Sequence, residues 1–312
     1  MDAELSLNSL LGDFSHLAAR MRHIAVEPEI SNQITGRGSY ISLREGSPTV
    51  ADFVSVFSHY LAAYALPRKQ LLAASDAAGS DPTLQSVHMT RLREDAASLF
   101  IKARKGSHRS GEFGEIVLYI LVEWLLQAPQ VVSKMFLKTA YQMPVHGTDG
   151  IHARLEDDGK LTLIWGESKA HKSLESALTD ALKSISDFIQ KEEVDAEVRL
   201  VSGHLDLGVL DKETYDAVLD YLNPYSEASN NRVNRFAVLL MFNFGYGDEG
   251  ECCDEELINR FTEKFEEFKI SVEKKAGVDP FSKKGFDFFL LPVPCVQDIR
   301  DRFQKIIGMP AE

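Results

Sequence analysis

The sequence predicts an α/β protein in which a mixed β-sheet is flanked by helices. Apolar residues recur at helical spacing in several segments, and strand-like segments lie between them. From Gly111 onward the order is a helix, three strands, a helix and a strand, which is typical of a compact α/β unit. Residues 1–105 are expected to form a mainly helical region. This region is either a domain of its own or an elaboration continuous with residues 106–312.

Two packing helices are expected in the N-terminal region. Residues Thr49–Leu66 carry an apolar stripe at helical spacing that stops before Pro67, whose ring removes a backbone donor. Residues Leu84–Lys102 follow a typical helix-start segment. A short strand-like stretch is expected around Tyr40–Leu43.

The same patterns predict the elements of the second region. Gly111–Gln127 is apolar on most sides, so we expect a largely buried helix there. Strands are predicted at Met135–Gln142, Thr148–Leu155, Leu161–Lys169, Glu197–Val201, Phe236–Phe244 and Phe286–Val293. Further helices are predicted at Ser173–Ile189, Asp254–Ala276 and Val296–Ile307.

Composition limits the classes of function. The 312 residues include 34 Lys and Arg, 47 Asp and Glu and three Cys, with a formal net charge of −13. Such an acidic chain argues against a tight stand-alone binder of nucleic acid, since those domains usually carry a basic surface. The few Cys and scattered His favour neither a disulfide framework nor a structural zinc site. We expect no membrane span and a cytoplasmic location, because no apolar run is long enough and the N-terminus lacks a signal-peptide pattern.

One short stretch departs from the acidic trend. Residues 101–110, IKARKGSHRS, contain no acid and four cationic side chains, Lys102, Arg104, Lys105 and Arg109. A run of this kind is usually a solvated loop. Its position just before the motifs described next also favours contacts with phosphate.

The most informative stretch is HGTDGIHARLEDDGKLTLIWGESKAH. Because a strand has a period of two, Glu167 and Lys169 point to the same face. A two-residue turn would place Asp149 opposite Ser168, whereas a three-residue turn at residues 157–159 would place it opposite Glu167. The Asp-Asp-Gly sequence favours the three-residue turn, a type I turn followed by a left-handed glycine.

The hydrophobic pattern supports this three-residue turn. In that register one face carries the apolar residues together with Asp149, Glu167 and Lys169, and the other face is polar except for Ile164. The buried face of a strand sets its register. Two carboxylates and one lysine are therefore expected to converge at the open end of the core face.

This grouping predicts a metal site. Two close carboxylates repel each other unless one takes up a proton or a divalent cation binds, and hard oxygen ligands suit Mg²⁺ or Mn²⁺. Lys169 can orient a water molecule or offset charge that develops on a phosphate. The alternative is a surface charge cluster at the end of a hairpin. The conjunction with Glu112 and Glu115 on the preceding helix favours metal-assisted phosphodiester hydrolysis.

The order of these motifs resembles the PD-(D/E)xK nuclease superfamily. More narrowly, GEFGE, HGTDGIHAR and WGESKAH resemble the HamA nuclease family of the bacterial Hachiman anti-phage defence system. The resemblance implies a restriction-endonuclease-like core and a Mg²⁺- or Mn²⁺-dependent endodeoxyribonuclease. It also implies a HamB-type helicase partner that restrains the nuclease and releases it on DNA.

The resemblance also implies roles for individual residues. Asp149 and Glu167 match the metal-binding acids, the backbone carbonyl of Ser168 would complete the ligand set, and Lys169 matches the motif lysine. Glu115, or else Glu112, resembles the helix acid of the superfamily, which makes Glu115 a further candidate metal ligand. Acids in a first helical turn also interact favourably with the helix dipole, which is the alternative explanation for both. The sequence departs from the family pattern in one respect, since no Pro precedes Asp149.

Three further residues near these motifs are candidates for phosphate contacts: His146, His171 and Lys172. A polar residue at a strand end is the simpler interpretation of each. For the whole chain, two other functions stay open beside the DNA nuclease. One is a non-catalytic regulatory or scaffold subunit on a nuclease fold, and the other is an RNA-directed phosphodiesterase.

Overall fold

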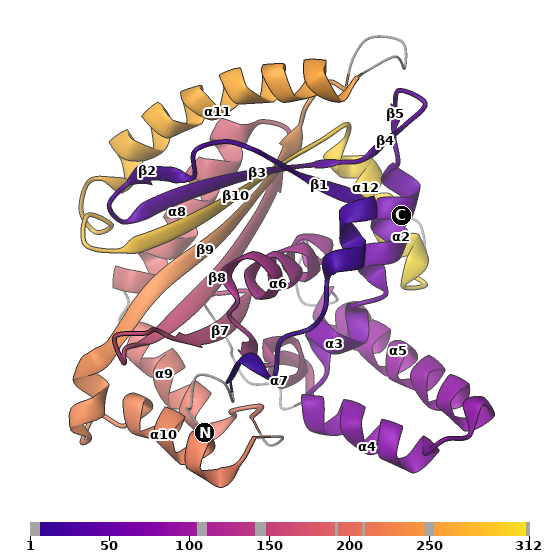
Figure 1. Cartoon of the computed structure of the whole chain (residues 1–312), viewed down its shortest axis with the longest axis vertical. Coiled ribbons are helices and arrows are strands. Elements are labelled where there is room, and N and C mark those ends of the chain that lie inside the picture. Colours follow the sequence, from indigo (N-terminus) through magenta and orange to yellow (C-terminus); the bar gives the residue numbers. More distant parts are fainter. Residues whose placement is uncertain are drawn as a thin grey trace.

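One eight-stranded sheet runs through the molecule (Figure 1). The computed structural model describes residues 7–104, 111–140, 148–190, 193–207, 210–246 and 253–309. The order of neighbouring strands is β1-β3-β10-β9-β8-β7-β6, and β2 also pairs with β3. The strands of this sheet are β1 (Met21–Ile24), β2 (Glu29–Ser31), β3 (Ile34–Ile41), β6 (Gln130–Val132), β7 (Gly150–Leu155), β8 (Leu161–His171), β9 (Arg232–Asn243) and β10 (Gly285–Val293).

The sheet is mixed, as the sequence predicts. Strands β3, β10, β9 and β8 run parallel to one another, whereas β7 is antiparallel to β8 and β6 is antiparallel to β7. At the other edge β1 and β2 are antiparallel to β3. A separate hairpin is formed by β4 (Leu43–Arg44) and β5 (Ser47–Pro48).

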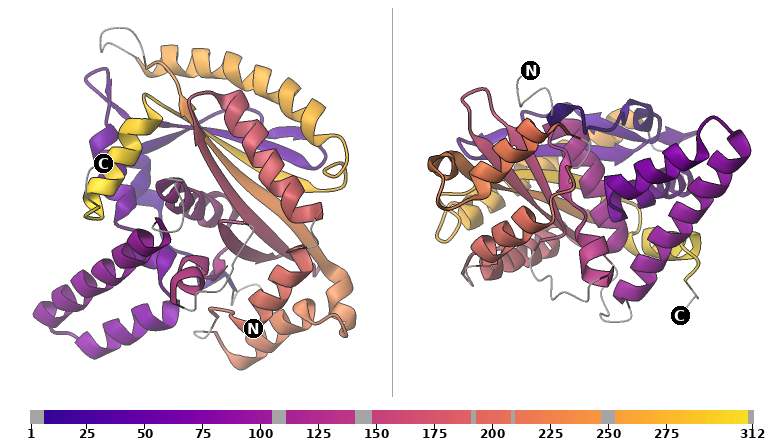
Figure 2. Two further views of the ribbon diagram at one scale, coloured as in Figure 1. Left: turned by 180° about the vertical axis from the view of Figure 1, so that it is seen from behind. Right: turned by 90° about the horizontal axis from the view of Figure 1, so that it is seen from below.

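Helices connect the strands and cover the sheet. They are α2 (Val50–Ser58), α3 (Leu61–Ala65), α4 (Arg68–Ala78), α5 (Pro82–Arg104), α6 (Glu112–Leu126), α7 (Lys134–Ala140), α8 (Leu174–Gln190), α9 (Glu193–Gly203), α10 (Lys212–Leu222), α11 (Asp254–Ala276) and α12 (Val296–Ile306). Two 3₁₀ helices are η1 (Ser15–Ala19) and η2 (Glu227–Asn231). Figure 2 shows α8 and α11 lying across the sheet when the molecule is seen from behind. In the described part of the chain, no helix is long and apolar enough to cross a membrane.

Alternating residues of β8 show how the two faces of the sheet are covered. Trp165 packs on Phe188 of α8, so α8 lies on the face that also carries Glu167. A Cβ on the next residue, Gly166, would lie 3.1 Å from the side chain of Leu118 in α6. Helices α6 and α8 therefore cover opposite faces of the same strand.

Most predicted elements are confirmed, but the strand predicted at Met135–Gln142 is wrong. Residues Lys134–Ala140 form helix α7, and the strand in this part of the chain is the short β6 just before it. The apolar residues Met135, Phe136 and Leu137 are consecutive. A short apolar run of this kind fits a buried strand and a buried helix equally well.

The strand predicted at Glu197–Val201 is also wrong, because this segment lies within helix α9. Residues Val194, Ala196, Val198 and Leu200 alternate with polar residues, which favoured a strand. In the helix, Glu197, Val198 and Val201 are buried. The residues that are buried follow the spacing of a helix and not the alternation of a strand.

The N-terminal region is not mainly helical throughout. Residues 21–48 contain β1 to β5, while the predicted helix at Thr49–Leu66 is present as α2 and α3, interrupted at His59 and Tyr60. Strand β3 pairs with β10 from the end of the chain. Residues from both sides of the boundary expected near residue 105 therefore form one sheet.

Candidate functional site

The β7–β8 hairpin has the turn and the register that the sequence predicts. Leu155 lies opposite Leu161, and the Glu156 N–H donates to the Lys160 carbonyl at 2.8 Å. Gly159 has a φ of +76°, in the left-handed region that favours glycine. The turn is thus the predicted three-residue type, which fixes where the side chains at the other end of the hairpin lie.

At that other end, two hydrogen bonds hold Asp149 beside β8. The Asp149 N–H donates to the Gly166 carbonyl at 2.7 Å, and the Ser168 N–H donates to Asp149 Oδ2 at 2.8 Å. The second bond fixes the carboxylate itself, not only the backbone. The expected convergence of Asp149 with the Glu-Ser-Lys motif is therefore present.

The prediction of a polar, outward face on this hairpin is wrong. His152, Thr162 and Ser168 are all buried, because helix α6 covers that face. A Cβ on Gly114 of α6 would lie 3.1 Å from Ser168 Oγ, so the absence of a side chain allows the helix to approach. The candidate site consequently lies at the end of a strand that is enclosed on both sides.

Glu167 and Lys169 form a close ion pair in this enclosed position. Lys169 Nζ lies 2.5 Å from Glu167 Oε1, and the two side chains are 14% and 5% exposed, respectively. Burial raises the pKa of Glu167 to about 7, and the Asp149 carboxylate adds to the rise, although Lys169 and a hydrogen bond from Ser184 oppose it. For Lys169, burial acts to lower the pKa, but the Glu167 and Asp149 carboxylates outweigh it and raise the pKa.

These charges suit a divalent cation. Two carboxylates beside one lysine carry a net negative charge when both are ionised, and a hard divalent cation relieves such a charge. In the described ranges no three His, Cys, Asp or Glu side chains are grouped closely enough to hold a metal ion. A metal ion here would therefore depend on Asp149 and Glu167, with the backbone carbonyl of Ser168 and water supplying further oxygen ligands.

Glu115 is connected to this site through a tyrosine. The Tyr64 hydroxyl donates to Glu115 Oε2 at 2.6 Å and also lies 3.2 Å from the Asp149 carbonyl oxygen. Burial raises the pKa of Tyr64, and Glu115 and Asp149 raise it further, so the hydroxyl remains protonated. Glu115 is thus linked to the backbone of Asp149 and does not complete a three-carboxylate cluster. Sequence reasoning missed Tyr64, which belongs to an ordinary apolar stripe.

An open pocket of about 450 Å³ adjoins the candidate site where β8 and β9 end and α12 begins. It includes the predicted residues Ser168, Lys169, His171 and Lys172. Its other lining residues are Gly111, Ala170, Asp180, Asn243, Cys295, Val296, Gln297 and Arg300. The phosphate candidates His171 and Lys172 therefore line the same pocket as Lys169, at a surface that solvent can reach.

Several remaining predictions cannot be placed. Lys105, Arg109 and His146 lie outside the described residues, as does the side chain of Arg104. Lys102 is exposed near the end of α5. The role of the basic run 101–110 in phosphate binding stays a prediction.

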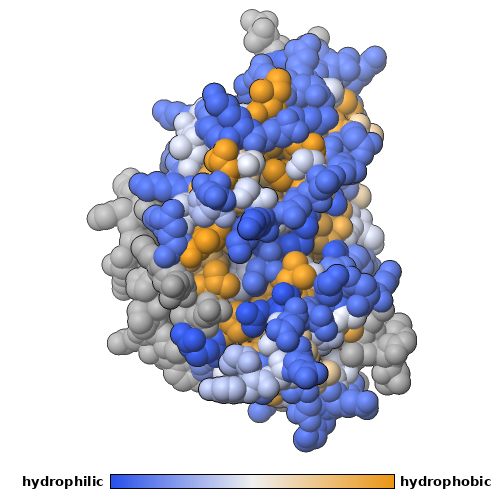
Figure 3. Space-filling model, turned by 90° about the vertical axis from the view of Figure 1, so that its left-hand side faces the viewer, coloured by the Kyte–Doolittle hydropathy of each residue, from blue (hydrophilic) through white to orange (hydrophobic). Residues whose placement is uncertain are grey.

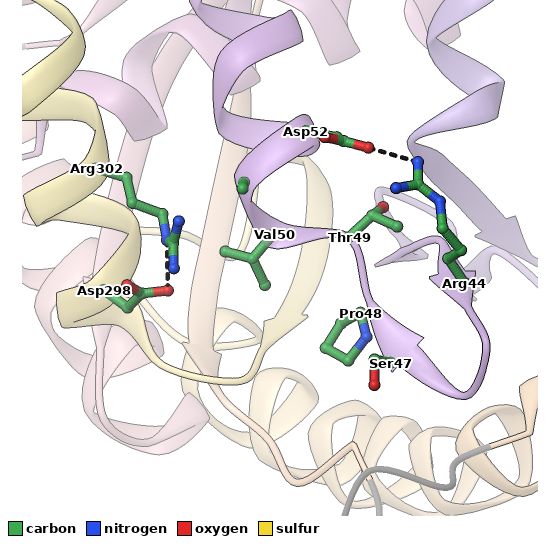
Figure 4. A pocket seen from close by; sticks show the side chains of 9 residues that line it. Arg44, Ser47, Pro48, Thr49, Val50, Asp52, Asp298 and Arg302 are labelled. Atoms are coloured by element: carbon green, nitrogen blue, oxygen red, sulfur yellow. Dashed lines mark hydrogen bonds and ion pairs between the residues drawn. The ribbon is translucent and has the colours of Figure 1, made fainter.

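A second pocket, of about 390 Å³, contains none of the predicted residues (Figure 4). It lies among the β4–β5 hairpin, the start of α2 and helix α12. Its two arginines are already paired, Arg44 with Asp52 at 2.6 Å and Arg302 with Asp298 at 2.8 Å.

The surface on the left-hand side of Figure 1 is mostly hydrophilic (Figure 3). Neither the second pocket nor this surface is therefore preferred over the end of β8 as the candidate site.

Comparison with known families gives one match. The family model HamA matches residues 21–307, which include every candidate site residue and each strand in the described part of the chain. No curated protein matches the chain.

Proposed function

This chain belongs to the HamA family of the Hachiman anti-phage defence system, and on that footing we propose that it is a metal-dependent nuclease that cleaves DNA. The observation that carries the proposal is the enclosed trio of Asp149, Glu167 and Lys169. Two carboxylates and a lysine in close proximity suit phosphodiester hydrolysis with Mg²⁺ or Mn²⁺.

In the proposed mechanism each residue has a distinct task. Asp149 and Glu167 would hold the ion together with the Ser168 carbonyl, and the Ser168 N–H keeps the Asp149 carboxylate in place. When bound, the ion makes a water molecule more acidic and offsets charge on the phosphate. Lys169 Nζ, which is paired with Glu167 in the structure, would orient the attacking water or offset negative charge that develops on the phosphate.

A helicase partner belongs to the same proposal. With a net charge of −13 the chain would hold DNA weakly by itself, because binding depends strongly on cationic contacts with phosphate. A HamB-type helicase would supply the capture of DNA and restrain the nuclease until it is needed. This arrangement would protect the host chromosome from a freely acting enzyme.

The test is cleavage of supercoiled plasmid by the purified full chain, with Mg²⁺, Mn²⁺ or EDTA, alone and with the helicase. We expect metal-dependent nicking or linearisation that Glu167→Gln and Lys169→Ala each reduce at least about a hundredfold, the size of effect seen when one charge-stabilising group is removed. A parallel digest of RNA separates the DNA nuclease from an RNA-directed enzyme. Cleavage by both folded variants at the wild-type rate would contradict the assignment, and no cleavage under any condition would favour a scaffold role.

A further inference from the structure

We propose that the pocket beside Lys169 binds a DNA backbone phosphate that neighbours the phosphate to be cleaved. In this proposal Arg300 is the side chain that mainly contacts the neighbouring phosphate. This inference rests on the proposed function, because the pocket opens directly beside the proposed reaction centre. It assigns a role to a helix at the end of the chain that no sequence motif singled out.

The fold holds this helix in a fixed position over the strand ends. Strands β8 and β9 are parallel and end at the pocket, where the Val296 N–H of α12 donates to Asn243 Oδ1 at 2.8 Å. The carboxyl ends of parallel strands are the usual place for ligands in open α/β sheets. Helix α12 therefore presents its first turns to the same edge that carries Lys169.

Arg300 lies against this edge. Its Nη2 donates to the Ala170 carbonyl at 2.6 Å, which places the guanidinium beside the backbone between Lys169 and His171. Its Nε is buried and so is out of reach of an anion in the pocket, whereas the bond to Ala170 uses only one of the N–H groups on the two Nη atoms of a side chain that lines the pocket. The guanidinium fork matches two phosphate oxygens, so its Nη groups retain capacity for an anion.

The surrounding charges support an anion at this place. Lys169 and Lys172 line the same pocket, and the Asp180 carboxylate at its rim lies 3.0 Å from His171 Nε2. Burial lowers the pKa of Arg300, while Glu112 and Asp301 act in the opposite direction. Arginine stays charged in proteins. With a divalent cation on Asp149 and Glu167, the pocket would be next to a further positive charge.

Helix α12 supplies a matched control. Arg302 lies two residues from Arg300, but it lines the other pocket and is paired with Asp298. Both arginines contribute one charge to the same helix. A difference between their variants therefore reports the pocket and not the net charge of the chain.

The experiment measures fluorescence anisotropy of a labelled 30-base-pair DNA duplex with the full chain in EDTA, over a range of KCl concentrations. EDTA prevents turnover, so binding is observed without cleavage. Arg300→Gln should weaken binding about tenfold and reduce the salt slope by about one, as expected for one lost phosphate contact. Arg302→Gln should stay within about twofold of the wild type. Circular dichroism and urea unfolding establish that each variant is folded.

A second variant protects the test against a folding defect. Lys172→Ala changes an exposed side chain in the same pocket and should weaken binding in the same direction. Equal affinity and salt slope in the wild type, Arg300→Gln and Lys172→Ala would overturn the inference, as would no binding by the unmodified chain. Binding that depends on Arg300 without any cleavage would support the phosphate pocket and count against the nuclease. Cleavage that is unaffected by Arg300→Gln would support the nuclease and count against the phosphate pocket.

Discussion

Tyr64 connects two acidic residues of the candidate site, Glu115 and Asp149. Its hydroxyl contacts Glu115 on α6 and the Asp149 carbonyl just before β7, and the side chain is buried. Tyr64, Glu115 and Asp149 come from separate segments of the chain. The Tyr64 hydroxyl therefore helps to hold the backbone of Asp149 in position relative to α6. A buried hydrogen bond to a charged carboxylate contributes to stability, and removing its donor loses that contribution.

We therefore expect Tyr64→Phe to reduce the free energy of unfolding by about 1.5–3 kcal/mol, the usual contribution of a hydrogen bond to a charged group. Urea unfolding of the wild type and the variant measures this difference. Tyr60→Phe is a suitable control, because the Tyr60 hydroxyl forms an exposed hydrogen bond with His16. A stability equal to that of the wild type would show that Tyr64 does not support the site.

At the level of single residues, the sequence located the acids and the lysine of the candidate site but not the residues that contact them. Asp149, Glu167 and Lys169 could be found because a turn and a strand period determine their positions. Ser184, Tyr64 and Arg300 come from helices far apart in the chain, and each belongs to a pattern that indicates only helix packing. Their contacts depend on tertiary structure, which no local spacing encodes.

Among the elements, the close contact between α6 and β8 determines the geometry of the site. Gly114 gives the helix no side chain where it meets Ser168, and a Cβ added there would lie 3.1 Å from Ser168 Oγ. A Cβ on Gly111, one turn earlier, would have nothing within 4 Å. Close approach of the helix to the strand therefore accounts for the glycine at position 114 and not for the one at position 111.

This contrast provides a matched pair of substitutions. Gly114→Val should destabilise the protein by about 1–3 kcal/mol, because a larger side chain would force α6 away from β8. Gly111→Ala should stay within about 0.5 kcal/mol of the wild type, as for other unobstructed positions. Thermal or urea unfolding of the two variants tests this. Equal effects would mean that the contact between α6 and β8 is not tight.

The helices and strands differ in how clearly the sequence predicts them. The β7–β8 hairpin was determined by its Asp-Asp-Gly turn, and α8 and α11 by long stretches with one helical period. Helices α7 and α9 are short, and their apolar residues fit a strand as well as a helix. Such segments adopt the structure that lets them pack, as Lys134 of α7 does in its 3.1 Å ion pair with Glu197 of α9.

Across the whole molecule, the sheet joins segments from both ends of the chain. Arg68 at the start of α4 also links the N-terminal region to later parts of the chain. Its side chain pairs with Glu123 of α6 at 3.2 Å, and its backbone N–H donates to Asp206 at 2.6 Å. Pairing between β3 and β10 could not be foreseen, because strand order depends on contacts between distant segments. The site is thus supported by a framework that includes the N-terminal region.

Stability of this framework should fall in mild acid. Burial lowers the pKa of His152 to about 4, while its Nδ1 lies 2.9 Å from the Ala128 carbonyl oxygen. The unfolded chain binds this proton near pH 6.5, so the contribution of His152 is complete above that pH and is lost as the pH falls toward 4. The loss amounts to about 3 kcal/mol from this residue.

Urea unfolding at intervals from pH 7.5 to pH 4.5 tests this prediction. The free energy of unfolding should decrease more steeply with falling pH in the wild type than in His152→Gln, which has no group that titrates at this position. Parallel curves for the two proteins would show that the burial of His152 does not make stability depend on pH.

The proposed function depends above all on a divalent cation at Asp149 and Glu167, and Mn²⁺ binding measured by calorimetry at pH 8 tests this directly. The wild type should bind Mn²⁺, and Glu167→Gln should lose at least about tenfold in affinity, the lower end of the effects seen around metal ligands. Glu115→Gln serves as the control and should bind as the wild type does, since Glu115 is joined to Tyr64. Equal Mn²⁺ affinity in the wild type and folded Glu167→Gln, or no binding by either, would contradict the proposed metal site.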